Sequence, residues 1–119
     1  TNTSSSLDST LSPLNLPSPL KAAIGFYSNC IQERFGYKYK ITGKDGSVAK
    51  NFFQKNTLEY GKSLIEFFFD VIISNNKSLP PSLALALSVY TENQYLYLWN
   101  KKKWEWGTEN PPLDKKWWL

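Results

Sequence analysis

The chain has 119 residues with no histidine and a single cysteine, Cys30. Without histidine, it lacks the usual acid/base group near neutral pH and the commonest side-chain ligand of transition metals. Ser/His/Asp and Cys/His catalytic arrangements are therefore excluded, and no sequence context supports a Ser/Lys dyad. A lone cysteine cannot close an internal disulfide. We expect a buried core thiol at Cys30, and no enzymatic activity, cofactor or metal site.

Methionine is also absent, even at position 1, so we expect a fragment or a processed product. The best apolar run, residues 64–73, is interrupted by Glu66 and Asp70 and is too short to span a bilayer. Residues 1–17 lack the cationic start and apolar block of a secretory signal. We therefore predict a cytoplasmic protein with no membrane association.

The sequence contains no complete motif of the kind that binds the phosphates of a small molecule. The segment from Gly43 to Ser47 resembles the end of a Walker loop, but it lacks the first glycine and the Lys-Ser/Thr pair. Glu66 and Asp70 are four residues apart on one expected helix, and we interpret them as solvated surface. A metal-dependent nuclease would need a further carboxylate opposite them. We expect no small-molecule substrate.

Cations are concentrated in the middle of a mildly basic chain with a net charge of +4. Between Arg34 and Lys62 there are seven cations and two anions, Asp45 and Glu59. Lysines interleaved with aromatic residues suit a nucleic acid, and an expected helix start near Ser47 would add free N–H groups. The predicted contacts are phosphates for Lys38, Lys40, Lys44, Lys50 and Lys55, with Tyr37 and Tyr39 stacking or packing. The alternative is a solvated basic face with core tyrosines.

The sequence predicts a mainly α fold, a compact three- or four-helix domain with a small C-terminal β-hairpin. Residues 1–17 are expected to be a flexible Ser/Thr/Pro-rich tail, residues 18–92 the helical domain, and residues 93–119 a Trp-rich extension. Ser18, Pro19 and Gly36 are helix start and stop signals. Further helices are expected from Asp45 or Ser47 to about 56, from Thr57 to about 74, and from Ser82 to about 91. The expected core contains Ile24, Tyr27, Ile31, Phe52, Leu64, Phe68 and Ile72.

The C-terminal region is dominated by tryptophan. Tyr, Trp and Leu alternate within residues 94–107, which favours a hairpin with aromatic cross-strand pairs. The expected loop, residues 100–103, has no glycine, so its turn type stays open. The predicted partner-binding residues are Trp99, Trp104, Trp106, Trp117 and Trp118, with packing on the helical core as the alternative.

Residues 24–75 resemble a small helical domain of phage and plasmid replication or DNA-binding proteins, of the replisome-organiser and helicase-loader kind. The resemblance rests on Phe26-Tyr27, the run from Arg34 to Tyr39, Gly43 to Gly46, Lys50 to Phe53, Tyr60-Gly61 and Leu64 to Phe69. It implies a helical fold that lies near DNA or a replication partner and has no enzymatic activity. The Trp-rich C-terminus departs from this pattern and weakly resembles the hairpins of phage structural proteins.

Two functions follow as hypotheses. The first is a non-enzymatic DNA-binding or DNA-associated adaptor that contacts phosphates through its lysine-rich helix-turn-helix region. The second is a structural or protein-interaction subunit of a larger assembly, such as a viral particle, that docks through its Trp-rich C-terminus. The expected partners are therefore nucleic acid and protein.

Overall fold

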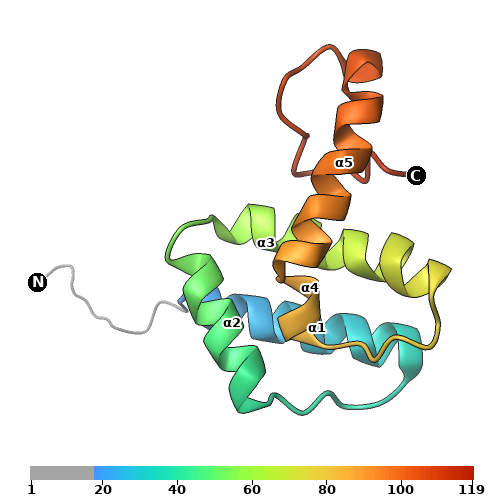
Figure 1. Cartoon of the computed structure of the whole chain (residues 1–119). Coiled ribbons are helices and arrows are strands. Elements are labelled where there is room, and N and C mark those ends of the chain that lie inside the picture. Colours follow the sequence, from blue (N-terminus) through green and yellow to red (C-terminus); the bar gives the residue numbers. More distant parts are fainter. Residues whose placement is uncertain (1–17) are drawn as a thin grey trace, which may run out of the picture.

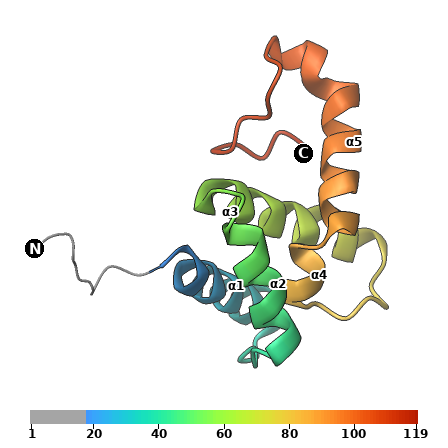
Figure 2. The ribbon, with the colours of Figure 1, turned by 60° about the vertical axis from the view of Figure 1, so that its left-hand side comes forward.

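A computed structural model describes residues 18–119, so the predicted tail, residues 1–17, lies outside the described residues. The elements are α1 (Pro19–Phe35), α2 (Gly43–Phe53), α3 (Leu58–Phe67), the π-helical segment η2 (Phe68–Ile73), α4 (Leu83–Ala86) and α5 (Val89–Trp106). α1 packs beside α3, and α2 contacts both α1 and α4. α5 rises away from these helices, and the C-terminal segment turns back along one side of it (Figures 1 and 2). The mainly α class is confirmed.

Each of the five α-helices within residues 18–119 begins at a Ser or Thr whose side-chain oxygen accepts a backbone hydrogen bond from the first turn of the helix. These N-caps are Ser18, Thr42, Thr57, Ser82 and Ser88. Two helices end at glycines in the left-handed conformation, where side chains are unfavourable. They are Gly36, with φ 77°, and Gly107, with φ 69°. The predicted start and stop signals of α1 are confirmed.

α3 and η2 form the centre of the molecule. Phe67, Phe68 and Phe69 are all buried, because other elements cover the helix on several sides. The Phe69 ring lies 5.2 Å from that of Tyr27 in α1, and the Phe67 ring lies 5.3 Å from that of Tyr95 in α5. The predicted core is confirmed except at Ile24, which is only partly buried against it, and Cys30 is buried as expected.

The predicted β-hairpin at residues 94–107 is wrong. Those residues lie almost entirely in α5, and residues 18–119 contain no strand. The buried residues of α5 are Thr91, Tyr95 and Trp99, which follow one another at the four-residue interval of a helix face. The strand preference of Tyr and Trp depends on context, and here burial against α3 decides the conformation.

The C-terminal segment after Gly107 shares the core of the helices. Its Trp117 ring stacks on Phe67 at 6.2 Å and meets Trp99 edge-on at 5.1 Å. The predicted division between residues 92 and 93 falls inside α5. The helical domain and the C-terminal extension are therefore joined by one continuous helix and one hydrophobic core.

Candidate functional site

The lysines predicted to contact phosphate lie on α2 and on the segments beside it. Lys38 and Lys40 precede α2, Lys44 and Lys50 are in it, and Lys55 is in the turn that follows it. All five are exposed, and within residues 18–119 none of them forms an ion pair. Their ammonium groups are thus available to an external anion.

The exposed side of α2 is polar and carries no exposed carboxylate. Ser47 is three residues from Lys44 and from Lys50, and four from Asn51, so these side chains occupy adjoining positions. Gln54 follows Lys50 by four residues and is also exposed. From residue 34 to residue 58 the sequence has one carboxylate, Asp45, and it is buried. We call Lys44, Ser47, Lys50, Asn51, Gln54 and Lys55 the α2 basic face.

Asp45 fixes the start of α2 to the start of α4. It is 1% exposed. Its Oδ2 accepts hydrogen bonds from the Thr42 N–H at 3.0 Å and the Tyr39 hydroxyl at 2.6 Å, and its Oδ1 accepts one from the Ala84 N–H at 2.9 Å. The Leu83 N–H donates in turn to the Tyr39 hydroxyl at 3.3 Å. One carboxylate thereby satisfies backbone donors of two helix ends.

These contacts determine the protonation state of the Asp45 carboxyl. Burial by itself would raise its pKa, but the hydrogen bonds from Tyr39, Thr42 and Ala84 outweigh burial and lower the pKa below the usual value. For Tyr39, burial and the hydrogen bond to Asp45 raise the pKa of the hydroxyl above its ordinary value. Asp45 is thus ionised and Tyr39 protonated at neutral pH.

The expected helix start near Ser47 is wrong, because α2 begins at Gly43. Thr42 and Asp45 form a capping box, in which each side chain accepts a hydrogen bond from the other residue's backbone N–H. The Asp45 charge therefore already occupies the positive end of the α2 dipole. The free N–H groups expected to bind phosphate near Ser47 are therefore not present at that position.

The two tyrosines of the predicted site have different surroundings. Tyr39 packs edge-on against Tyr27, with ring centroids 4.9 Å apart, and its hydroxyl is bonded to Asp45. Tyr37 is about half exposed and lies 6.2 Å from the ring of Phe35, which is exposed to a similar degree. Only Tyr37 has a face available for stacking on a base.

The five tryptophans also divide into two groups. Trp99, Trp117 and Trp118 are buried, and the indole N–H of each has an acceptor. Trp99 donates to the Glu109 carbonyl at 2.9 Å, and Trp117 donates to the Tyr95 hydroxyl at 3.2 Å. These three residues hold the C-terminal segment against the core. Trp104 and Trp106, on α5, are exposed.

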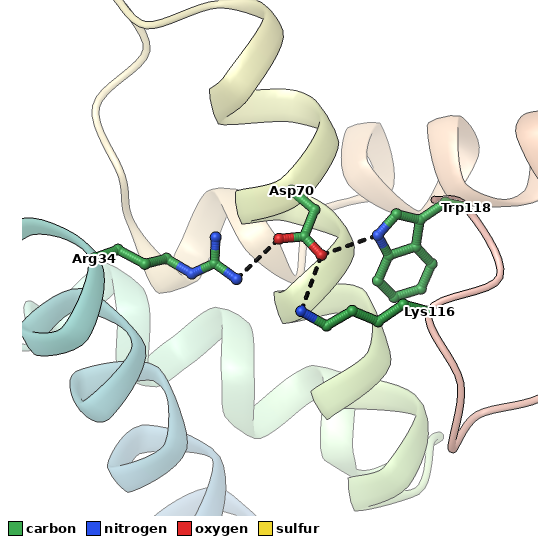
Figure 3. Close-up of polar contacts among 4 residues, drawn as sticks. All are labelled: Arg34, Asp70, Lys116 and Trp118. Atoms are coloured by element: carbon green, nitrogen blue, oxygen red, sulfur yellow. Dashed lines mark hydrogen bonds and ion pairs between the residues drawn. The ribbon is translucent and has the colours of Figure 1, made fainter.

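Asp70 holds the C-terminal segment through polar contacts. Its Oδ1 accepts a hydrogen bond from the Arg34 guanidinium at 2.9 Å (Figure 3). Its Oδ2 lies 3.0 Å from the Trp118 indole nitrogen and 3.3 Å from the Lys116 ammonium. Burial alone would raise the pKa of Asp70, but bonds from Trp118, Arg34 and Lys116 lower it. The interpretation of Asp70 as solvated surface is therefore wrong, because its side chain is 11% exposed.

Sequence reasoning missed one surface, the outer side of α5. Tyr97 is exposed there, and the Lys101 ammonium lies 4.5 Å from its ring centroid. The hairpin interpretation hid this surface, because a strand would place Tyr95, Tyr97 and Trp99 together on one side. The missed signals were Ser88 and Gly107, a helix N-cap and a helix-ending glycine eighteen helical residues apart.

Across residues 18–119, no helix is both long and apolar enough to cross a membrane. The same residues contain no cluster of three His, Cys, Asp or Glu side chains that could hold a metal ion. The chain matched no family model, no curated protein and no solved structure.

Proposed function

We propose that the chain is a non-enzymatic nucleic-acid-binding module, with DNA as its ligand, that contacts phosphates through the α2 basic face. The observation behind this proposal is that the exposed side of α2 carries lysines and no exposed carboxylate, because the one acidic residue of the helix, Asp45, is buried and hydrogen-bonded. Outside the helix, the acidic side chain of Glu92 lines one surface pocket with Asn51 and Lys55. The Glu92 carboxylate accepts a hydrogen bond from the Tyr60 hydroxyl. Exposed lysines that form no ion pair within the protein attract phosphate and displace its counterions. Lys38 and Lys40 extend the same charge along the preceding segment.

The shape of α2 favours duplex DNA over duplex RNA. Its 11 residues form a rod about 16 Å long. The major groove of B-DNA admits such a helix, whereas the major groove of A-form RNA is too narrow. Asn51 and Gln54 have side chains of the kind that pair with adenine in the major groove, and Ser47 adds a hydroxyl.

The fixed orientation of α2 is the second observation that supports DNA binding. The bonds from Asp45 to Thr42 and Ala84 hold the start of α2 against α4. A helix held in this way loses little conformational freedom when it binds, so less of the interaction energy is lost to ordering. The resemblance of residues 24–75 to replication proteins extends the proposal to an adaptor in DNA replication.

The test compares two variants that lose the same charge. One carries Lys44→Gln, Lys50→Gln and Lys55→Gln; the control carries Lys21→Gln, Lys77→Gln and Lys115→Gln, three exposed lysines elsewhere. Fluorescence anisotropy with a labelled DNA duplex measures the affinity. We expect the first variant to bind on the order of 10- to 100-fold more weakly and the control to change little. Equal weakening in both variants would mean that net charge alone governs binding.

A second candidate is an interaction subunit of a larger assembly, docking through exposed aromatic residues near the C-terminus. The observation that favours it is the exposure of Trp104, at 77%, and Trp106, at 40%, because exposed tryptophans are frequent at interface centres. Removing residues 94–119 would not be a clean test, since this deletes Tyr95 and Trp117 from the core.

Point substitutions test the second candidate instead. We expect co-purification from the native host to recover a protein that persists after nuclease treatment and is lost with Trp104→Ser and Trp106→Ser together. The α2 triple variant is the matched control and should retain this protein. Recovery that disappears with nuclease alone would contradict the second candidate and favour the first.

A further inference from the structure

α5 carries a line of exposed aromatic side chains that the α2 basic face does not involve. Tyr90, Tyr97 and Trp104 are 51%, 60% and 77% exposed and are spaced seven residues apart. Seven residues are close to two helical turns, so the three rings follow one face over about 21 Å. Tyr95 and Trp99, each two residues from Tyr97, lie on the opposite, buried face. We call Tyr90, Tyr97 and Trp104 the α5 aromatic stripe.

The surroundings of the stripe are mostly amides and carry no net charge. Asn93, Gln94 and Asn100 are exposed amides beside it. The formal charges among its flanking positions are Glu105, exposed beside Trp104, and Lys101, whose ammonium lies 4.5 Å from the Tyr97 ring centroid. A neutral aromatic surface of this kind suits another neutral aromatic surface better than a charged partner.

The neighbouring cations are directed elsewhere. The Lys102 ammonium lies 3.4 Å from the Trp118 carbonyl oxygen, and that of Lys103 lies 2.8 Å from the Glu109 carboxylate. Single-stranded nucleic acid requires cations that follow its backbone alongside the stacking rings. Within the described part of the chain, Lys101 is the one cation beside the stripe that has no such contact, so single-stranded nucleic acid is a poor match for this surface.

The stripe is symmetrical about Tyr97, with Tyr90 seven residues before and Trp104 seven residues after. If two α5 helices pair antiparallel about this point, Tyr97 faces Tyr97 of the second copy and Tyr90 faces Trp104. Asn93 then faces Lys101, and Gln94 faces Asn100. No like charges meet across the pair, and the seven-residue repeat is the period at which paired helices keep one seam in contact.

The exposed apolar area is large enough for such a pair. Val89 and Leu96, 70% and 38% exposed, adjoin the stripe along the same side of α5. Five partly exposed large side chains offer roughly 100 Å² each, so two copies would bury on the order of 1,000 Å² together. That is the lower limit for a specific interface, which implies a reversible dimer of modest affinity. In Figure 2 the C-terminal segment lies on one side of α5.

We propose that the α5 aromatic stripe is a self-association surface on which a second copy of this chain packs antiparallel. The proposal rests on the second candidate function, docking through exposed C-terminal aromatic residues, and names the partner. It is independent of DNA binding by α2.

Charged substitutions at Tyr97, the centre of the symmetry, test the proposed self-association. Sedimentation equilibrium at concentrations up to several hundred micromolar should detect a dimer of the wild type. Tyr97→Glu and Tyr97→Lys should each be monomeric, since like charges would then face each other. An equimolar mixture of the two should form a dimer again, because glutamate then faces lysine. Leu119→Glu, at a residue that is 80% exposed outside α5, is the matched control and should remain dimeric.

Circular dichroism shows whether the variants fold, and we expect no change because Tyr97 is exposed. A wild type that stays monomeric, a dimer that survives Tyr97→Glu, or a mixture that stays monomeric overturns the proposal. Binding of an oligothymidine that is lost in Tyr97→Glu would assign the stripe to single-stranded nucleic acid and also overturn it. If the wild type is monomeric and Trp104→Ser still removes a host protein, only this proposal fails, and the second candidate function stands.

Discussion

The carboxylate of Asp45 accepts a hydrogen bond at 2.9 Å from the backbone N–H of Ala84, 39 residues further along the chain. The same carboxylate caps α2 through Thr42. Besides Ala49 and Phe52, which pack α2 into the core, one buried charged group thus holds α2 against α4, and the α2 basic face depends on the position of α2.

Asp45→Asn tests this dependence. Whichever way the new amide turns, its NH₂ group faces a backbone N–H, that of Thr42 or that of Ala84, and one buried donor is left unpaired. We expect the free energy of unfolding to fall by about 1–3 kcal/mol. Urea unfolding measures the change. The matched control is Asp114→Asn, an exposed aspartate, which should stay within about 0.5 kcal/mol of the wild type.

The dependence of the free energy of unfolding on acid pH follows from the lowered pKa values of Asp45 and Asp70. Each carboxyl titrates at a lower pH in the folded chain than in the unfolded chain, where its pKa is about 4. Their stabilising contribution is therefore complete above about pH 4 and is lost as the pH falls through the folded-state values. We expect stability to decline below about pH 4 in the wild type and less steeply in Asp45→Asn. An identical acid decline in both proteins would contradict the role given to Asp45.

A double-mutant cycle measures how Asp70 holds the C-terminus. Trp118→Phe keeps an aromatic ring but removes the N–H that donates to Asp70 at 3.0 Å. Combined with Asp70→Ala, it should show a coupling energy of about 1–2 kcal/mol in urea unfolding. Trp106→Phe, on the exposed part of α5, should couple to Asp70→Ala by less than about 0.5 kcal/mol. Equal coupling energies would mean that the bond to Trp118 contributes little.

Proline at position 100 distinguishes a helix from a hairpin. Asn100 is exposed inside α5, where proline removes a backbone hydrogen bond and clashes with the preceding turn. We expect Asn100→Pro to lower the free energy of unfolding by about 3 kcal/mol and to reduce the far-UV helix signal. Asn100→Ala is the control and should change neither appreciably. A hairpin loop would tolerate the proline, so a well-folded Asn100→Pro protein would contradict α5.

Local signals were sufficient to predict α1 and most of the core. Ser18, Pro19 and Gly36 determine the ends of α1 through groups within a few residues of each other. The apolar period through Leu64 and Phe68 predicted a central helix for the same reason, although not the π-helical segment that continues it. These features depend on neighbours in sequence, which is why the sequence alone revealed them.

Contacts between distant residues were not predictable. Nothing near Asp45 indicates that Ala84 would donate to it, and nothing near Asp70 indicates Trp118 as a partner. For α5, alternation of aromatic residues was given more weight than the four-residue interval between Tyr95 and Trp99. Which of two competing periods is realised depends on the surface that covers the segment, here Phe67 and Trp117.

The most direct test of the α2 basic face is the salt dependence of DNA binding. The slope of log affinity against log salt concentration should become shallower by about one unit for each of Lys44, Lys50 and Lys55 replaced by glutamine. Wild-type and variant slopes that coincide, or a wild-type affinity that does not change with salt, would contradict the account.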